Sequence, residues 1–295
     1  MKIKKIPNVL YLLILIGLFV LTLVMLIPIL NILALSLSDP GRVNEVKGMT
    51  IIPKGFSLIN YKVLLSNPNV LKSIFNSLFI TISATTLNIL LTSILAYVLT
   101  RKNLIGRKVL ITILIVVMVF EPGLVPEYLL IKKLGLIDSY LSVILYKAIN
   151  VYYLIILMRF FEEVPESLIE AAKIDGASHI TILFRIMLPL AKPAIATIGL
   201  FYTVFHWNEY FRASIYLNST SKWPLQVVLR QFVVLDDTTS MIGADKLLSF
   251  SDAAQLNYNA LQAGTIIIAM IPVLLLYPLI LKYFTKGTFD GGVKY

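Results

Sequence analysis

Long apolar stretches, separated by short polar segments, dominate this chain of 295 residues. Most stretches reach the roughly 20 residues that an α-helix needs to cross the hydrocarbon core of a bilayer. The predicted spans cover residues 9–36, 73–99, 109 onward, 140–161, 193–217 and 260–284. The pattern therefore predicts an all-α, polytopic membrane protein with six transmembrane helices.

Polar segments between the spans define three regions. Residues 1–71 hold the first span and a segment rich in Gly, Pro and Lys that we expect outside the cell. Residues 72–284 form the transmembrane core and include a long polar loop at about 162–192. Residues 285–295 form a cytoplasmic tail. The first span is far longer than the core of a signal peptide, about 7–15 residues, so we expect it to be retained.

The third span is interrupted by Glu121-Pro122-Gly123. Proline removes a backbone donor and glycine loosens the backbone, so we expect a kinked helix end there. Glu127 follows closely, and no ligand is assigned to either segment.

Basic residues indicate the orientation. The tightest basic clusters at span ends are Lys4-Lys5 and the turn at residues 101–108, which we call the basic turn. Lys and Arg accumulate in short cytoplasmic loops. The pattern therefore places the N-terminus, the basic turn, the polar loop and the C-terminus inside.

Composition agrees with a membrane protein, since 58% of residues are hydrophobic and 14% are charged. The net charge of +10 does not indicate nucleic-acid binding, because the basic residues cap apolar segments and form no stripe. The chain has no cysteine, which excludes disulfides and cysteine nucleophiles. It also lacks a phosphate-binding loop and any persuasive catalytic constellation, so we expect neither ATP binding nor catalysis by this chain.

The polar loop carries the strongest signal. Pro165-Glu166-Ser167 is typical of a helix start, and Gly176 can adopt a positive φ that ends the helix. A second helix is predicted from about Ser178, broken by prolines before the fifth span. The pattern leaves two interpretations open, a docking site for a soluble partner or an interfacial loop that binds nothing.

The loop also resembles the EAA loop of permease subunits in ATP-binding-cassette (ABC) importers. The matching segments are Glu170-Ala171-Ala172, Asp175-Gly176-Ala177, Ile186, Leu188-Pro189 and Pro193. The resemblance implies a type I importer permease fold and a coupling helix that docks in a groove of a cytoplasmic ATPase. It assigns ATPase coupling to Glu170, Ala171, Ala172, Asp175, Gly176, Ala177, Ser178 and His179.

Motifs elsewhere resemble the sugar-importer branch, in particular the smaller maltose-permease subunit. Pro53-Lys54-Gly55-Phe56-Ser57 and Trp207-Asn208 carry this likeness, and Pro224-Leu225-Gln226 and Tyr277-Pro278 resemble the LplC/YtcP-like subgroup. That resemblance implies an ATP-driven, binding-protein-dependent importer of oligosaccharides, including acidic ones, in a prokaryotic cytoplasmic membrane. The implied partners are a second permease, two ATPases that bind ATP and Mg²⁺, and an extracytoplasmic solute-binding protein. No cofactor or metal is implied in this chain.

Polar residues inside the fifth span form a candidate substrate pathway. The spacing of Tyr202, His206, Glu209 and Ala213 predicts one shared helix face. Trp207, Asn208 and Tyr210 lie beside it, and aromatic planes next to hydrogen-bonding groups suit sugars. An aromatic belt with an internally satisfied His–Glu pair is the alternative. A metal at His206 is not expected, because no second histidine or cysteine lies near it in the sequence.

Small polar residues recur at helical spacing in the second span, which favours helix packing over ligand binding. They are Ser77, Thr81, Thr85, Asn88 and Thr92. The long segment at 218–259 is predicted to contact a substrate-delivering protein. Two other functional classes stay open, namely a proton-coupled secondary transporter using Glu209 and His206, and a membrane scaffold or enzyme that binds proteins through the polar loop.

Overall fold

The computed structural model describes residues 8–235 and 257–290. Within these ranges the regular structure is helical, with one isolated β-bridge between Ser38 and Phe56, which confirms the all-α prediction. The N-terminal lysines, residues 236–256 of the predicted delivery-protein contact and the last five residues lie outside the described ranges. The chain divides into two compact units, Met1–Leu71 with Leu229–Ile271 and Lys72–Val228 with Pro272–Tyr295.

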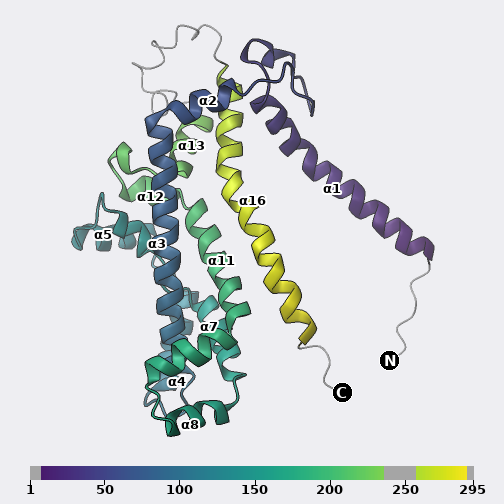
Figure 1. The fold of residues 1–295 in the computed structure, drawn as a ribbon. Coiled ribbons are helices and arrows are strands. Elements are labelled where there is room, and N and C mark those ends of the chain that lie inside the picture. Colours follow the sequence, from purple (N-terminus) through teal and green to yellow (C-terminus); the bar gives the residue numbers. More distant parts are fainter. Residues whose placement is uncertain (1–7, 236–256, 291–295) are drawn as a thin grey trace. The chain divides into compact units, whose positions relative to one another are not determined.

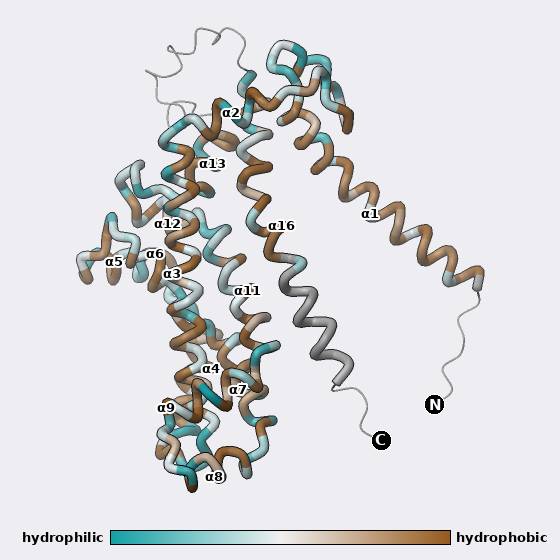
Figure 2. The backbone as a smooth tube through the Cα atoms, viewed as in Figure 1, coloured by the Kyte–Doolittle hydropathy of each residue, from teal (hydrophilic) through white to brown (hydrophobic). Residues whose placement is uncertain are grey.

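The first unit begins with α1 (Asn8–Ser36), which is hydrophobic along nearly its whole length (Figure 2). Its most apolar window is 0% buried within the chain. A helix that is apolar all round is covered by lipid or by another chain. The short helices η1 (Pro40–Glu45) and α2 (Ile59–Ser66) follow. Asn60 donates to the carbonyls of Ser36 and Ser38, at 3.0 Å each, and ties α2 to the end of α1.

The second unit is built around α3 (Pro68–Leu99). Helices α4 (Arg107–Val119) and α8 (Glu166–Ile174) lie at one end of α3, and α12 (Phe211–Tyr216) lies toward the other (Figure 1). Further elements are α5 (Leu124–Lys133), α6 (Tyr140–Ile144), α7 (Val151–Glu162), α9 (His179–Ile182), η2 (Leu183–Met187), α10 (Leu188–Leu190), α11 (Lys192–Asn208) and η3 (Thr220–Lys222). Helices α3, α13 (Leu225–Val233) and α16 (Tyr258–Asp290) contribute residues to both units.

Three described helices are long and apolar enough to cross a membrane, at Val9–Ser36, Pro68–Leu99 and Tyr258–Leu276. The number rises to five if each of two bent helix pairs counts as one span. One pair bends by 115° between α4 and α5, which confirms the predicted kink, and the other bends by 86° ahead of α11. α16 continues past the predicted end of the sixth span, to Asp290. The six-span count and the orientation remain predictions.

The fourth predicted span is not one helix, because α6 ends at Ile144 and α7 begins at Val151. Between them Lys147 has a φ of 49°, and the Asn150 side chain caps the start of α7. The Lys147 carbonyl accepts a hydrogen bond from Asn88 of α3 at 3.2 Å. A side chain of a neighbouring helix thus replaces the backbone bond that the break removes.

Polar residues of the second predicted span pack against other helices of the same unit, as predicted. The contacts join Ser77 to Leu225, Thr85 to Thr203, Asn88 to His206 and Thr92 to Tyr202. These pairings satisfy groups that would otherwise be costly to bury.

A buried apolar cluster holds the polar loop against α3, α7 and α11. Its members are Ala96, Tyr97, Leu99, Leu154, Leu157, Met158, Phe161, Ile169, Ile182, Leu183, Met187, Ala191, Ala194 and Ile198. Between helices in a bilayer such side chains are held by van der Waals packing, because lipid tails are as apolar as the side chains themselves. The cluster therefore fixes the inner side of the loop and leaves its outer side to other contacts.

Candidate functional site

The polar loop begins with α8, which starts at Glu166 as predicted and places that carboxylate at the positive end of the helix dipole. At its other end the Gly176 N–H donates to the Lys173 carbonyl at 3.0 Å. The Ala177 N–H donates to the Ala172 carbonyl at 2.9 Å. This pair of bonds is a Schellman motif, which satisfies carbonyls that a helix end leaves free.

Gly176 has a φ of +78°, the left-handed conformation that L side chains rarely adopt. The prediction of a positive φ at this residue is confirmed. A Cβ built at Gly176 would have no atom within 4 Å, so the backbone conformation and not crowding requires glycine. The space over the turn is therefore open to a partner.

The loop has an apolar side facing inward and exposed isoleucines facing outward. Ile169 is 5% exposed and belongs to the buried cluster. Ile174 and Ile180 flank the glycine turn and are 86% and 72% exposed. Large apolar side chains gathered at an exposed turn are typical of a surface that another protein covers.

The second helix of the loop is fastened to α3. The Ser178 side chain caps α9 by accepting from the Thr181 N–H at 3.2 Å. Next to it, His179 Nδ1 lies 2.8 Å from the Tyr97 hydroxyl. The π-helix η2 follows, and the chain then bends by 86° before α11 begins. This bend confirms the predicted break before the fifth span.

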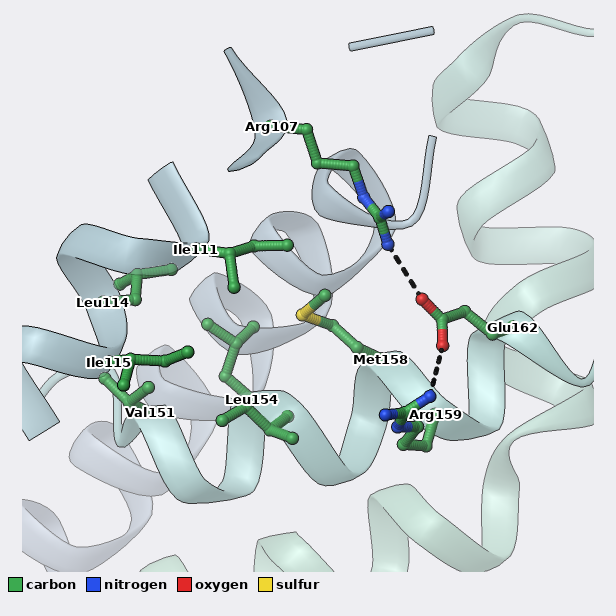
Figure 3. Close-up of a pocket in the computed structure, with 10 residues that line it drawn as sticks. Arg107, Ile111, Leu114, Ile115, Val151, Leu154, Met158, Arg159 and Glu162 are labelled. Atoms are coloured by element: carbon green, nitrogen blue, oxygen red, sulfur yellow. Dashed lines mark hydrogen bonds and ion pairs between the residues drawn. The ribbon is translucent and has the colours of Figure 1, made fainter. Parts of the chain in front are cut away.

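Ion pairs join the basic turn to the polar loop. Lys102 Nζ lies 2.6 Å from Glu166, and both side chains are exposed, so the pair contributes little to stability. The hydrogen bond from Lys102 nonetheless lowers the pKa of Glu166. Glu162 lies between Arg107 at 2.9 Å and Arg159 at 3.3 Å (Figure 3). Both predicted inner segments thus meet at the same end of α3.

Two cavities border these ion pairs. The smaller one has a volume of about 410 Å³ and lies between α4 and α7, with the Glu162 pairs at its edge (Figure 3). The larger one, of about 1100 Å³, lies between the basic turn and the polar loop and is lined by residues that include Glu170, Lys173 and His179. Glu170 and His179, for which a coupling role is predicted, therefore have open space beside them.

The prediction that Tyr202, His206, Glu209 and Ala213 share the face of one continuous helix is wrong. Tyr202 and His206 lie on α11, but that helix ends before Glu209, whose ψ of 100° is extended. Ala213 lies on the separate helix α12. The Glu209 carboxylate caps α12 by accepting from the Arg212 N–H at 2.9 Å. No proline or glycine marks this break in the sequence.

Three of the candidate pathway residues are buried in helix packing, because Tyr202, His206 and Trp207 are 1%, 4% and 3% exposed. The Tyr202 hydroxyl lies 2.9 Å from Thr92 Oγ1 and accepts from the Asn150 N–H at 2.9 Å. Asn208 is exposed, and Glu209 and Tyr210 are half-buried. A role in substrate passage stays a prediction for all six residues.

Comparison with known proteins supplies the family. A scan against protein-family models gives no match. The polygalacturonan/rhamnogalacturonan transport system permease protein YtcP of Bacillus subtilis (strain 168) is 42% identical over 272 residues, covering 92% of this chain and 93% of YtcP. Protein LplC of the same organism is 41% identical over 269 residues, covering 91% and 89%. This chain belongs to the ABC sugar-transport permeases.

A solved structure agrees with this permease family. It is described as a bacterial ABC transporter involved in the import of the acidic polysaccharide alginate. One of its chains matches the permease with a TM-score of 0.86 at 29% identity, covering 96% of this chain and 99% of that one. The match confirms the predicted ABC importer permease fold.

We call the bend between α4 and α5 the elbow. Sequence reasoning missed a cluster of charged residues that lies at this elbow of the permease. Lys147 Nζ lies 2.8 Å from Glu121, and Arg212 Nη2 lies 3.8 Å from Glu127. The Arg212 guanidinium also lies over the Tyr146 ring, 4.5 Å from its centroid. Ionisable residues within apolar stretches were the available signal, but nothing in the sequence joined these segments. In the described part of the permease, no group of three or more His, Cys, Asp and Glu residues could hold a metal ion.

Proposed function

We propose that this permease is the membrane subunit of an ATP-driven, binding-protein-dependent importer in a prokaryotic cytoplasmic membrane. A second, similar permease completes the pore, and an extracytoplasmic solute-binding protein delivers the substrate. Two ATPase subunits bind ATP and Mg²⁺ and dock on the inner loops of the two permeases, one of them on the polar loop of this chain. Membership of the ABC sugar-transport permeases supports this assembly.

The observation that carries the docking role is the open glycine turn between the exposed side chains of Ile174 and Ile180. An ATPase groove would cover these side chains and the coupling residues from Glu170 to His179. Closure of the ATPases would push on this turn. The buried cluster around Ile169 would carry that displacement into α3, α7 and α11, because packed cores move as rigid bodies.

We infer that the substrate is an oligosaccharide of the acidic class. The name of the relative YtcP refers to polygalacturonan and rhamnogalacturonan, and the structural relative takes part in alginate import. The ligand must bind the outward-facing state more tightly than the inward-facing one for import to have a direction.

Replacing Gly176 with tryptophan tests the docking role. Gly176→Trp should abolish uptake by the reconstituted complex while ATP hydrolysis and membrane insertion persist, because the indole would occupy the docking surface. Gly135→Trp is the matched control, since Gly135 has a φ of +69° and also has nothing within 4 Å of a built Cβ. Normal uptake by Gly176→Trp would overturn the docking role.

A further inference from the structure

A cavity of the permease outside the polar loop lies against the elbow. Its volume is about 470 Å³, within the range of small-molecule sites. Its wall is mostly apolar and includes Phe120, while Glu127, Tyr146 and Tyr216 bring polar groups to it. Gly123 forms the elbow with a φ of 82° and a ψ of 169°, a conformation open essentially to glycine alone. Broken helices in membrane transporters expose backbone and side chains to a substrate in this manner.

Three buried polar atoms at this place have no hydrogen-bond partner among the described residues. They are Glu127 Oε2, Arg212 Nε and the Tyr216 hydroxyl. Glu127 Oε2 and Arg212 Nη2 are 3.8 Å apart, which is too long for a hydrogen bond. Their side chains are only 20% and 25% exposed. Buried polar groups are nearly always paired with protein, water or ligand, so this cluster has capacity for a ligand.

The unpaired atoms define the chemistry of that ligand. Glu127 and Tyr216 line the cavity, and Arg212 does not. Glu127 Oε2 requires a donor, and the Tyr216 hydroxyl can donate or accept. A sugar hydroxyl both donates and accepts, so neighbouring hydroxyls on one ring can satisfy both. The lining holds the carboxylates of Glu121 and Glu127 against the single ammonium of Lys147, so its charge does not favour a ligand carboxylate.

We propose that the elbow cavity is a subsite that binds one pyranose ring of the transported oligosaccharide and recognises the hydroxyls of that ring. Glu127 and Tyr216 bind the hydroxyls, and the ring of Phe120, 72% exposed, covers an apolar face of the sugar. Lys147, paired with Glu121, also lines the cavity. The inference rests on the importer function proposed above and locates substrate contact at the elbow and not on α11.

Uptake kinetics test the subsite in the complete reconstituted transporter. The wild type is first screened with oligosaccharides from polygalacturonan, alginate and arabinan, and the one taken up fastest becomes the probe. Glu127→Gln and Tyr216→Phe should each raise the KM for that probe about tenfold or more, because the first replaces a charged acceptor by a neutral amide and the second removes a hydrogen bond to the sugar. Tyr128→Phe is the matched control, since its ring stacks on Tyr216 at 6.4 Å without lining the cavity.

Thiol labelling gives a second measurement that does not depend on the kinetic variants. The chain has no native cysteine, so Phe120→Cys creates a single reporter inside the cavity. A charged methanethiosulfonate should modify it, and the probe should slow that modification at least tenfold. Val119→Cys is the control, because Val119 is 65% exposed and does not line the cavity.

The outcomes separate the two proposals. No uptake of any screened oligosaccharide by the wild type would overturn the importer function and the subsite together. Normal wild-type uptake with unchanged KM in both variants would overturn the subsite alone. Equal reaction of Phe120→Cys with and without the probe would also overturn the subsite alone. So would a Phe120→Cys that never reacts, because lipid or the second permease would then fill the cavity.

Discussion

The Tyr202 hydroxyl connects three helices of the second unit. It lies on α11, contacts Thr92 of α3 and accepts from the backbone N–H of Asn150 at the start of α7. The Tyr202 ring also packs edge-on against Tyr153, with centroids 4.9 Å apart. A residue with these contacts is held by packing, and substrate contact is not needed to explain it.

Tyr202→Phe should therefore weaken the fold and leave substrate affinity unchanged. Loss of the hydroxyl removes the hydrogen bond to the half-buried Asn150 N–H, which costs about 0.5–1.5 kcal/mol. Thermal unfolding of the purified complex measures the loss, and uptake kinetics measure KM. Tyr152→Phe, on a ring that is 60% exposed, should change neither quantity. An increased KM at unchanged thermal stability would instead return Tyr202 to the substrate pathway.

Local residue signals predicted the ends of α8 correctly and missed the break at Glu209. Proline, glutamate and glycine act on the backbone within a few residues, so the helix start and the turn at Gly176 were readable. The interruption at Glu209 instead involves the cap that its carboxylate gives to α12. Glutamate is not among the preferred N-cap residues, so nothing at Glu209 signalled a helix start.

At the scale of elements, Asp138 joins the segment after α5 to the segment after α12. Its carboxylate accepts from the Ser219 N–H at 2.9 Å, the Ser219 hydroxyl at 2.7 Å and Lys222 Nζ at 2.7 Å. Lys222 also donates to the Asp138 carbonyl. The hydrogen bond from Lys222, followed by those from Ser219, lowers the pKa of Asp138.

This lowered pKa gives the contact a defined pH dependence. A carboxyl group whose pKa is lower in the folded state stabilises that state above its unfolded pKa, near 3.9, and the contribution is lost as pH falls through the folded pKa. Asp138→Asn should therefore reduce the melting temperature at neutral pH. The melting temperature of this variant should also fall less than that of the wild type as the pH is lowered. Melting curves from about pH 3 to pH 7 measure both effects, with the exposed Asp175→Asn as control. Equal curves for Asp138→Asn and the wild type would contradict the predicted linkage.

The length of the apolar runs predicted where long helices lie, but it did not predict where a helix is interrupted. The long runs that became α1, α3 and α16 were recognised, because each is continuous over many turns. The run at 140–161 is also apolar over most of its length but breaks near Lys147, where Asn88 and Tyr202 supply hydrogen bonds from other helices. The elbow cavity was unpredictable for the same reason, since its walls come from segments distant in sequence.

At the scale of the whole molecule, the predicted orientation can be tested directly in the cysteine-free chain. Ile105→Cys reports on the basic turn, where Ile105 is 95% exposed, and Glu45→Cys reports on η1. If the N-terminus is inside, a membrane-impermeant maleimide should label Glu45→Cys in intact cells and Ile105→Cys only after permeabilisation. The reverse labelling pattern would require the opposite orientation.

The length of α1 has a consequence for the surrounding lipid. Its 29 residues extend about 43 Å, against a hydrocarbon core of about 30 Å. Because its most apolar window is 0% buried within the chain, we expect hydrophobic mismatch to be relieved by tilting. Asn60 ties the end of α1 to α2, so a change of tilt would be passed to the polar segment that follows. Bilayer thickness would then act on the permease's first unit without any ligand being bound.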